Sequence, residues 1–414
     1  MKKINIIYYV LIGSLIVLLF IGSCNEYKEP PMITEPVIEY ADNPTITAIS
    51  PSEVAVAGVR DITISGTNFA TDGGMDTTIV YIGGELANIK NITSNQIVIY
   101  RPVIFGENLM IRVVVPSALN VGGLDGYDVE EPILKFGDFS RQAYDLYAIA
   151  VSETEDLYIA TSYKILHLTS DGINLKTMAI LNPVTFGTIT DMKCGPGGYL
   201  YLLTGRKKMY RLMPNPDITD STYADSDIHY ADLSKNSEFF DFDANDNIFF
   251  GRRDGLWKLH NDTSESYTGY YDDIPIKAIN VFNGYVYVAT AGKLSRNQII
   301  DQEGNLGPIE EIVDIKSKPS WSSAEISSFT MDENGNVMFC LKYVSGNSIF
   351  ILEQDGSVTP YYINNILPTK VDQIVYGQGN HIFLNRGITL GGSEYSDSVR
   401  VYKMGMQFES APRN

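Results

Sequence analysis

The sequence predicts an all-β protein in which a small β-sandwich precedes a six-bladed β-propeller. From about residue 144 to residue 407 one pattern recurs six times: a short apolar segment, a turn rich in Gly, Asn or Asp, and a second, more apolar segment. The first residues of these second segments lie 43, 48, 38, 51 and 45 positions apart. Such a period, without a helical pattern between copies, is typical of four-stranded propeller blades. Residues 43–128 instead alternate apolar and polar positions between closely spaced turns, which favours a sandwich.

The six copies share apolar columns. The second segments begin at Leu157, Leu200, Ile248, Val286, Val337 and Ile382, and two apolar residues follow in every copy. Eight positions earlier the chain has Ile149, Met192, Phe240, Ala278, Phe329 and Ile374. We therefore expect an inner strand packed between neighbouring blades and a second strand covered on both faces.

A third segment alternates apolar, polar, apolar at residues 166–168, 210–212, 257–259 and 402–404. Period two predicts that the polar members of these segments, His167 among them, face outward. A ring closes only if its first and last blades share strands, since an open edge would expose unpaired backbone groups. We expect residues 132–136 to be the outer strand of blade six and residues 399–404 to be its third strand.

The chain begins with Met1-Lys2-Lys3 and an apolar run from Ile4 to Ile21. The ending Ile21-Gly22-Ser23-Cys24 resembles the bacterial lipobox, in which the Cys is acylated and becomes the new N-terminus. Residues 1–23 are thus expected to be a lipoprotein signal peptide and residues 24–42 a polar, Pro-rich tether. Acidic residues soon after Cys24 look like the export signals of Bacteroidota lipoproteins, which implies an outer-membrane anchor facing the cell exterior.

Residues 43–130 resemble the IPT/TIG family of immunoglobulin-like modules, through Ile49-Ser50-Pro51 and Gly66-Thr67-Asn68-Phe69. The resemblance implies an Ig-like core without a disulfide. Residues 131–414 are similar to the NHL class of propeller, on copies such as 239–259. Together with the acylated Cys, this arrangement resembles surface lipoproteins of gut Bacteroidota, several of which accompany glycan-uptake systems.

The composition limits the possible chemistry. The chain has 31 basic and 50 acidic residues and a formal net charge of −19, which argues against nucleic-acid binding. Beyond Cys24 only Cys194 and Cys340 remain, and both fall in apolar columns, so we expect free thiols. Four scattered histidines have no second ligand at zinc spacing, and no nucleophile elbow or phosphate loop is present. We expect no catalytic residue, no metal and no cofactor.

The expected ligand site is the propeller face built by the loops entering each inner strand and the loops joining strands two and three. These loops carry the aromatic residues Trp321, Tyr270, Tyr271, Phe186, Tyr223 and Tyr230 and the arginines Arg206, Arg252 and Arg253. Exposed aromatic faces suit sugar rings, and arginines suit anionic groups. The alternative is that the aromatic side chains cover the core and the arginines are solvated.

A second group of polar residues precedes the innermost column and is expected to line the mouth of the central channel: Asp191, Glu238, Lys277 and Asp372. Three carboxylates could hold a divalent cation, but Lys277 would oppose it. We interpret them as hydrated polar lining.

These observations predict a non-catalytic, surface-anchored binding lipoprotein that serves as a glycan-binding accessory of a nutrient-uptake system. One alternative is a propeller lactonase or lyase with a metal at the channel mouth. Another is a scaffold or adhesion lipoprotein that binds protein. The sequence leaves open the identity of the ligand, the choice between glycan and protein, and the oligomeric state.

Overall fold

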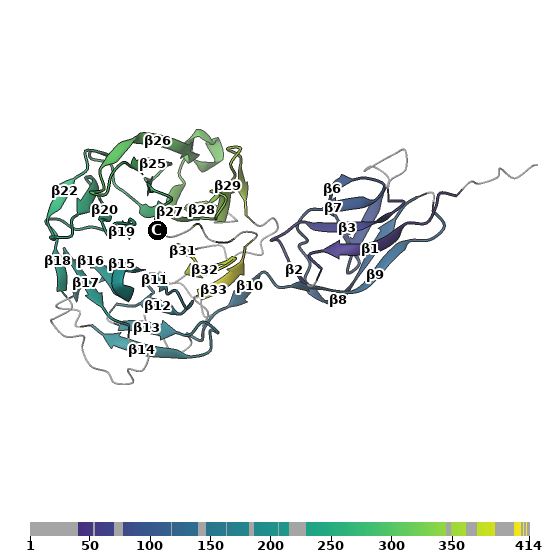
Figure 1. Cartoon of the computed structure of the whole chain (residues 1–414), viewed down its shortest axis with the longest axis horizontal. Helices are drawn as coiled ribbons and strands as arrows, with labels where there is room; N and C mark the ends of the chain where they lie inside the picture. The colour runs from purple at the N-terminus through teal and green to yellow at the C-terminus, as the bar shows by residue number, and fades with distance from the viewer. Residues whose placement is uncertain are drawn as a thin grey trace, which may run out of the picture.

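The computed structural model describes residues 40–414 except 53, 70–77, 117, 140–145, 163, 182–185, 206, 215–228, 345–348, 362–370, 386–400, 407, 408, 410 and 412–414. The described residues form two β domains joined by a short connection (Figure 1). No helix among them has the length and apolar character needed to cross a membrane. The predicted signal peptide, Cys24 and most of the predicted tether lie outside the described residues, as do Arg206 and Tyr223.

The first domain is a two-sheet sandwich. One sheet has the strand order β1-β3-β7-β6 and the other the order β2-β9-β8-β4-β5. Their bounds are β1 (Thr45–Ser50), β2 (Val54–Val56), β3 (Ile62–Thr67), β4 (Ile79–Ile82), β5 (Glu85–Ala87), β6 (Ile89–Ile92), β7 (Gln96–Ile99), β8 (Gly106–Val114) and β9 (Gly122–Glu130). Alternate residues of β3, β4 and β7 are buried between the sheets, as a side-chain period of two requires.

The turn at residues 66–69 shows why the sequence carries Gly, Asn and Phe there. A Cβ on Gly66 would lie 1.8 Å from the carbonyl oxygen of Thr45, so no side chain fits. Asn68 has a φ of 60°, a left-handed conformation that Asn tolerates better than most residues. Phe69 is buried in the sandwich core. Three local requirements therefore produce the Gly-x-Asn-Phe signature.

The described residues from 133 to 405 form six four-stranded antiparallel sheets around a central axis (Figure 1). Blade 1 comprises β11 (Ala148–Val151), β12 (Leu157–Ala160), β13 (Lys164–Leu168) and β14 (Leu175–Ile180); blade 2 comprises β15 (Ile189–Cys194), β16 (Leu200–Thr204), β17 (Lys208–Leu212) and β18 (His229–Asp232); blade 3 comprises β19 (Phe239–Phe242), β20 (Ile248–Arg252), β21 (Gly255–Leu259) and β22 (Glu265–Tyr267). Blade 4 comprises β23 (Ala278–Phe282), β24 (Tyr285–Ala289), β25 (Lys293–Ile299) and β26 (Leu306–Asp314); blade 5 comprises β27 (Glu325–Met331), β28 (Val337–Lys342), β29 (Ile349–Leu352) and β30 (Val358–Pro360); blade 6 comprises β31 (Gln373–Tyr376), β32 (His381–Asn385), β33 (Val401–Gly405) and β10 (Ile133–Lys135).

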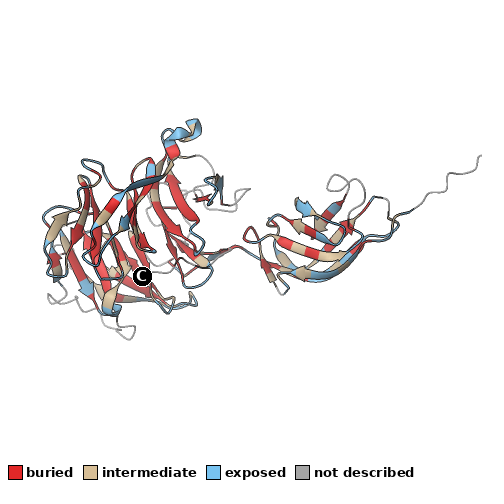
Figure 2. Ribbon diagram, turned by 45° about the horizontal axis from the view of Figure 1, so that its top comes forward, coloured by how far each residue is buried: buried red, intermediate tan, exposed pale blue. Residues whose placement is uncertain are grey.

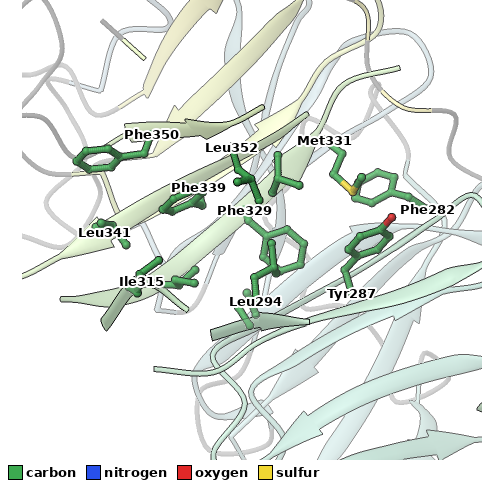
Figure 3. Close-up of a cluster of buried hydrophobic side chains, with 14 of the residues drawn as sticks. Phe282, Tyr287, Leu294, Ile315, Phe329, Met331, Phe339, Leu341, Phe350 and Leu352 are labelled. Atoms are coloured by element: carbon green, nitrogen blue, oxygen red, sulfur yellow. The ribbon is translucent and has the colours of Figure 1, made fainter. Parts of the chain in front are cut away.

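The apolar columns predicted from the repeat are confirmed. Each predicted second segment lies in the second strand of a blade, and each residue of the earlier column is a buried member of an inner strand. Buried residues concentrate in these strands and exposed residues in the outer ones (Figure 2). Figure 3 shows one interface between blades, where Phe282 and Tyr287 of blade 4 pack near Phe329 and Met331 of blade 5.

Ring closure also follows the prediction. β10 pairs antiparallel with β33, so the segment before blade 1 supplies the outer strand of blade 6. The Gly405 amide donates to the Pro132 carbonyl oxygen at 3.0 Å, and the Phe136 amide donates to the Val401 carbonyl oxygen at 2.9 Å. The connection between the two domains therefore runs directly into the strand that closes the propeller.

The outward-facing prediction for the third strands is only partly correct. Arg211 is exposed, but His167 and Lys258 are buried. His167 lies 2.8 Å from an Asp156 carboxylate oxygen, and the Lys258 ammonium group donates to the Glu303 carbonyl oxygen. Both polar groups can be buried because a neighbouring turn supplies an acceptor. The two described cysteines, Cys194 and Cys340, form no disulfide.

Candidate functional site

A cavity opens where the inner strands begin, at one mouth of the central channel. Its volume is ≈ 370 Å³, within the usual range for small-molecule sites. All six blades contribute to its lining: Tyr147 from blade 1, Thr190, Asp191 and Lys193 from blade 2, Asn236, Glu238 and Phe239 from blade 3, Asn280 from blade 4, Ser327 and Lys342 from blade 5, and Asp372 and Gln373 from blade 6. The prediction that polar residues preceding the inner column line the channel mouth holds for Asp191, Glu238 and Asp372, whereas Lys277 is not among the lining residues.

Polar side chains of the inner strands also join one blade to the next. The Phe240 amide donates to Asp191 at 3.1 Å, the Val281 amide to Asp241 at 2.8 Å, the Ile374 amide to Ser328 at 3.1 Å and the Ile149 amide to Gln373 at 2.9 Å, while the Asn280 amide group donates to the Phe329 carbonyl oxygen at 2.5 Å. Neighbouring inner strands belong to separate sheets, so these side chains satisfy backbone groups that no ladder reaches. Several polar residues of the channel therefore stabilise the ring.

Asp191 is the most deeply buried acid of the cavity. Its exposed fraction is 5%, and its two carboxylate oxygens accept the Met192 amide at 2.9 Å and the Phe240 amide at 3.1 Å. Burial raises the pKa of Asp191 to about 6, although Lys193 and the hydrogen bonds from the two backbone amides act to lower it. The Asp191 carboxyl group thus links two inner strands and also lines the cavity. Its pKa lies closer to neutrality than that of an ordinary aspartate.

The remaining charged residues of the mouth each have an oppositely charged or polar neighbour. Glu238 lies 3.6 Å from Arg253, Asp372 lies 3.9 Å from Lys342, and the Lys193 ammonium group donates to Asn280 at 3.2 Å. Lys277, beside the cavity, lies 3.6 Å from Glu325. Within the described ranges no three His, Cys, Asp or Glu side chains converge as metal ligands would.

Two aromatic rings and the hydroxyl group of Ser327 also line the cavity. Tyr147 and Phe239 are half-buried at the cavity wall. The Oγ atom of Ser327 is buried and has no hydrogen-bond partner in the part of the chain that the structure describes. A ligand hydroxyl placed in the cavity could supply that partner. Sequence reasoning missed Tyr147, Phe239 and Lys342, because no column of the repeat marks them as exceptional.

The prediction of an exposed aromatic face is wrong for Phe186 and Tyr271, which are buried. Phe186 packs on Tyr210 with 4.4 Å between ring centroids. The Tyr271 hydroxyl donates to Asn297 at 3.0 Å, and burial raises its pKa to about 12. Tyr270 is half-buried against the core cluster that contains Tyr271, and its hydroxyl donates to the Leu306 carbonyl oxygen at 3.2 Å. These side chains support blade packing, which was the alternative interpretation.

Trp321 and Tyr230 are half-buried in separate places. Trp321 packs against Phe350 with 4.7 Å between centroids, and the Lys318 ammonium group lies 4.7 Å from its ring. Tyr230 belongs to β18 in blade 2 and Trp321 to the segment before blade 5. Neither residue lines the channel cavity. Among the residues that the structure describes, the predicted aromatic side chains therefore do not gather at the channel cavity.

The two described candidate arginines have opposite environments. Arg252 has an exposed fraction of 2%, lies 2.6 Å from Glu265, and stacks between Phe250 and Trp257. It is a core residue, so its predicted place on a ligand face is wrong. Arg253 is exposed, beside Glu238 at the channel mouth. The two neighbours differ because successive residues at a strand end point in opposite directions.

The sandwich can be assigned to a family. Residues 44–129 match the family model for the IPT/TIG domain. The first domain is of the IPT/TIG type. The match covers this domain alone, and the repeat region follows it. No curated protein matches the chain significantly.

The solved structures to which this chain is similar have low sequence identity. A putative phosphatase from Bacteroides thetaiotaomicron aligns with 14% identity over 88% of this chain and 97% of its own, with a TM-score of 0.50. A luciferin-regenerating enzyme aligns with 11% identity over 67% of this chain and 95% of its own, also with a TM-score of 0.50. An auxiliary nutrient binding protein from Bacteroides ovatus aligns with 12% identity over 87% and 97% of the two chains, with a TM-score of 0.46. At these identities the likeness concerns the fold alone.

Proposed function

We propose that the protein is a non-catalytic binding protein that holds a carbohydrate in the channel-mouth cavity. The observation that carries the proposal is the composition of the lining: two aromatic rings, Tyr147 and Phe239, beside uncharged hydrogen-bonding groups such as Asn236 and Ser327. A sugar ring buries its apolar face on an aromatic side chain while its hydroxyls need donors and acceptors. The buried, unsatisfied Oγ of Ser327 favours a ligand hydroxyl at that point.

Binding without catalysis is favoured by the way the acids of the cavity are used. Asp191 accepts two backbone amides, Glu238 neighbours Arg253, and Asp372 neighbours Lys342. A lactonase or lyase would need these carboxylates for a metal or a proton transfer. Their present contacts instead suit the support of the ring and a hydrated polar wall.

Removal of the Tyr147 ring should weaken carbohydrate binding about tenfold, the loss expected when a well-packed aromatic contact worth about 1.4 kcal/mol disappears. The measurement is a glycan array followed by calorimetric titration of the best glycan with wild type, Tyr147→Ala and Ser327→Ala. Trp321→Ala is the matched aromatic control, since Trp321 lies outside the cavity.

The outcomes separate three functions. Loss of binding in Trp321→Ala with full binding in Tyr147→Ala would place the ligand on the loop face and contradict the cavity site. Affinity for protein with no glycan on the array would support the scaffold alternative. Turnover of a lactone that stops on chelation would support the enzyme alternative.

We also propose that the chain is anchored by an acylated Cys24 to the outer membrane and faces the cell exterior, where a glycan-uptake complex would be its partner. The support is the lipobox-like stretch and the tether that follows it. Cys24→Ala should move the protein from the membrane fraction to the soluble fraction and abolish labelling by a radioactive fatty acid. Unchanged labelling would contradict the assignment, and protease treatment of whole cells tests the exterior location.

A further inference from the structure

A second polar and aromatic cluster lies away from the channel-mouth cavity, on blade 2. Arg211, in β17, is exposed, and its guanidinium carbon lies 4.8 Å from the centroid of the Tyr199 ring and 5.0 Å from that of the Tyr230 ring. Tyr199 follows the turn after β15, and Arg211 is near the last residue of β17. The channel-mouth cavity lies at the other end of β15, where the strand begins. The Arg211 cluster is therefore on the opposite face of the propeller.

The two tyrosine rings restrain the guanidinium group without using its donors. A planar cation is attracted to the faces of aromatic rings, whereas its N–H groups point outward in its own plane. The Tyr230 ring is itself fixed by an edge contact to Tyr201, with 5.4 Å between centroids. Much of the rotamer freedom that an exposed arginine loses on binding is thus already restricted.

The unused donors of Arg211 distinguish it from several other basic residues of this acidic protein, which form ion pairs. Arg296 lies 2.8 Å from Glu310, Lys293 lies 2.6 Å from Glu311, and Arg252 is paired with Glu265. Within the described part of the chain, the Arg211 guanidinium group makes no hydrogen bond or ion pair, and it lies against the two tyrosine rings. A restrained guanidinium group with unused donors is suited to bidentate binding of an oxyanion.

We propose that Arg211, Tyr199 and Tyr230 form a second binding site for the oxyanion group of an acidic saccharide, either the carboxylate of a uronic acid or a sugar sulfate. The saccharide part of this assignment rests on the proposed carbohydrate-binding function, whereas the oxyanion part rests on the cluster itself. The guanidinium edge binds the anionic group, and the exposed parts of the tyrosine rings contact the adjoining sugar ring. An extended acidic glycan would then have one contact on each face of the propeller.

The test is calorimetric titration of the full chain with trigalacturonate, a sulfated disaccharide, neutral galactotriose and a glutamate-rich peptide. Arg211→Gln should weaken binding of the matching acidic sugar about tenfold or more, because a charge-assisted bidentate contact is lost. Arg211→Lys should weaken it less, since the charge remains and the planar fork does not. Arg101→Gln is the control, because Arg101 lies over a single ring, that of Tyr361, at 5.8 Å.

The variants also separate this site from the channel-mouth site. Tyr147→Ala should leave the effect of Arg211→Gln unchanged, and Arg211→Gln should leave neutral-glycan binding unchanged. Equal binding of acidic sugars by wild type and Arg211→Gln, or no binding of either acidic sugar in the millimolar range, would overturn the proposal. Preference for the acidic peptide over both sugars would overturn its saccharide part. Matching thermal unfolding of the variants shows that any loss is local.

Discussion

Glu265→Ala is expected to lower the free energy of unfolding by about 3–5 kcal/mol, because it leaves the buried charge of Arg252 without its partner. The Arg252 side chain is 1% exposed, and its guanidinium group lies 2.6 Å from Glu265. Its remaining donors reach Ser237 at 3.0 Å and Ser234 at 3.1 Å, and neither hydroxyl can neutralise a cation. Chemical denaturation of wild type and variant measures the effect.

The control for this prediction is Glu311→Ala. Glu311 also sits on an outer strand and also lies 2.6 Å from a basic group, that of Lys293, but both side chains are about half exposed. Water screens such a pair, so its loss should cost less than about 1 kcal/mol. Equal losses in the two variants would show that burial does not decide the strength of these pairs. In the double variant Arg252→Met, Glu265→Leu, much of the stability should return, since no unpaired charge remains.

Leu134→Pro should destabilise the propeller by about 3 kcal/mol or more, because it breaks the ladder that closes the ring. Pro132 and Phe136 both hydrogen-bond to β33, so by alternation the amide of Leu134, midway between them, also faces that strand. Leu134 is 52% exposed, so the loss would come from the backbone and not from the core. The measurement is the midpoint of denaturant unfolding.

Lys135→Pro provides the matched control. The amide of Lys135 points away from β33, toward the open edge of blade 6, and an edge strand tolerates proline at such a position. We expect only a small loss of stability for this variant. If Lys135→Pro proved as damaging as Leu134→Pro, the register of β10 on β33 would be wrong. If neither had an effect, β10 would contribute little to closure.

The repeat made most of the propeller predictable. Residues such as Ile149 and Leu157 recur at fixed offsets because every blade repeats the same local backbone, and a strand buried on both faces needs apolar residues at successive positions. The closing strand at residues 132–136 was predictable for a related reason. Without an outer strand from the segment before blade 1, the edge of blade 6 would expose unpaired backbone groups.

The candidate site was only partly predictable. Asp191, Glu238 and Asp372 were placed at the channel mouth by their offset from the inner column, which depends on local geometry. Phe186 and Tyr271 were expected on the surface but are buried, because each packs against residues of a neighbouring strand or blade. Tyr147 belongs to no repeating aromatic position, and only the convergence of six blades brings it to the cavity.

By itself, then, the sequence determined which segments are strands, how often the blade pattern recurs and where the IPT/TIG domain lies. These features follow from side-chain periodicity and turn chemistry within short stretches of chain. Only the tertiary structure decided that Arg252 is paired inside the core, that Arg211 is held between two tyrosines, and which polar groups share the cavity. Each of these depends on the partner that another strand supplies, and one-dimensional periodicity carries no information about that partner.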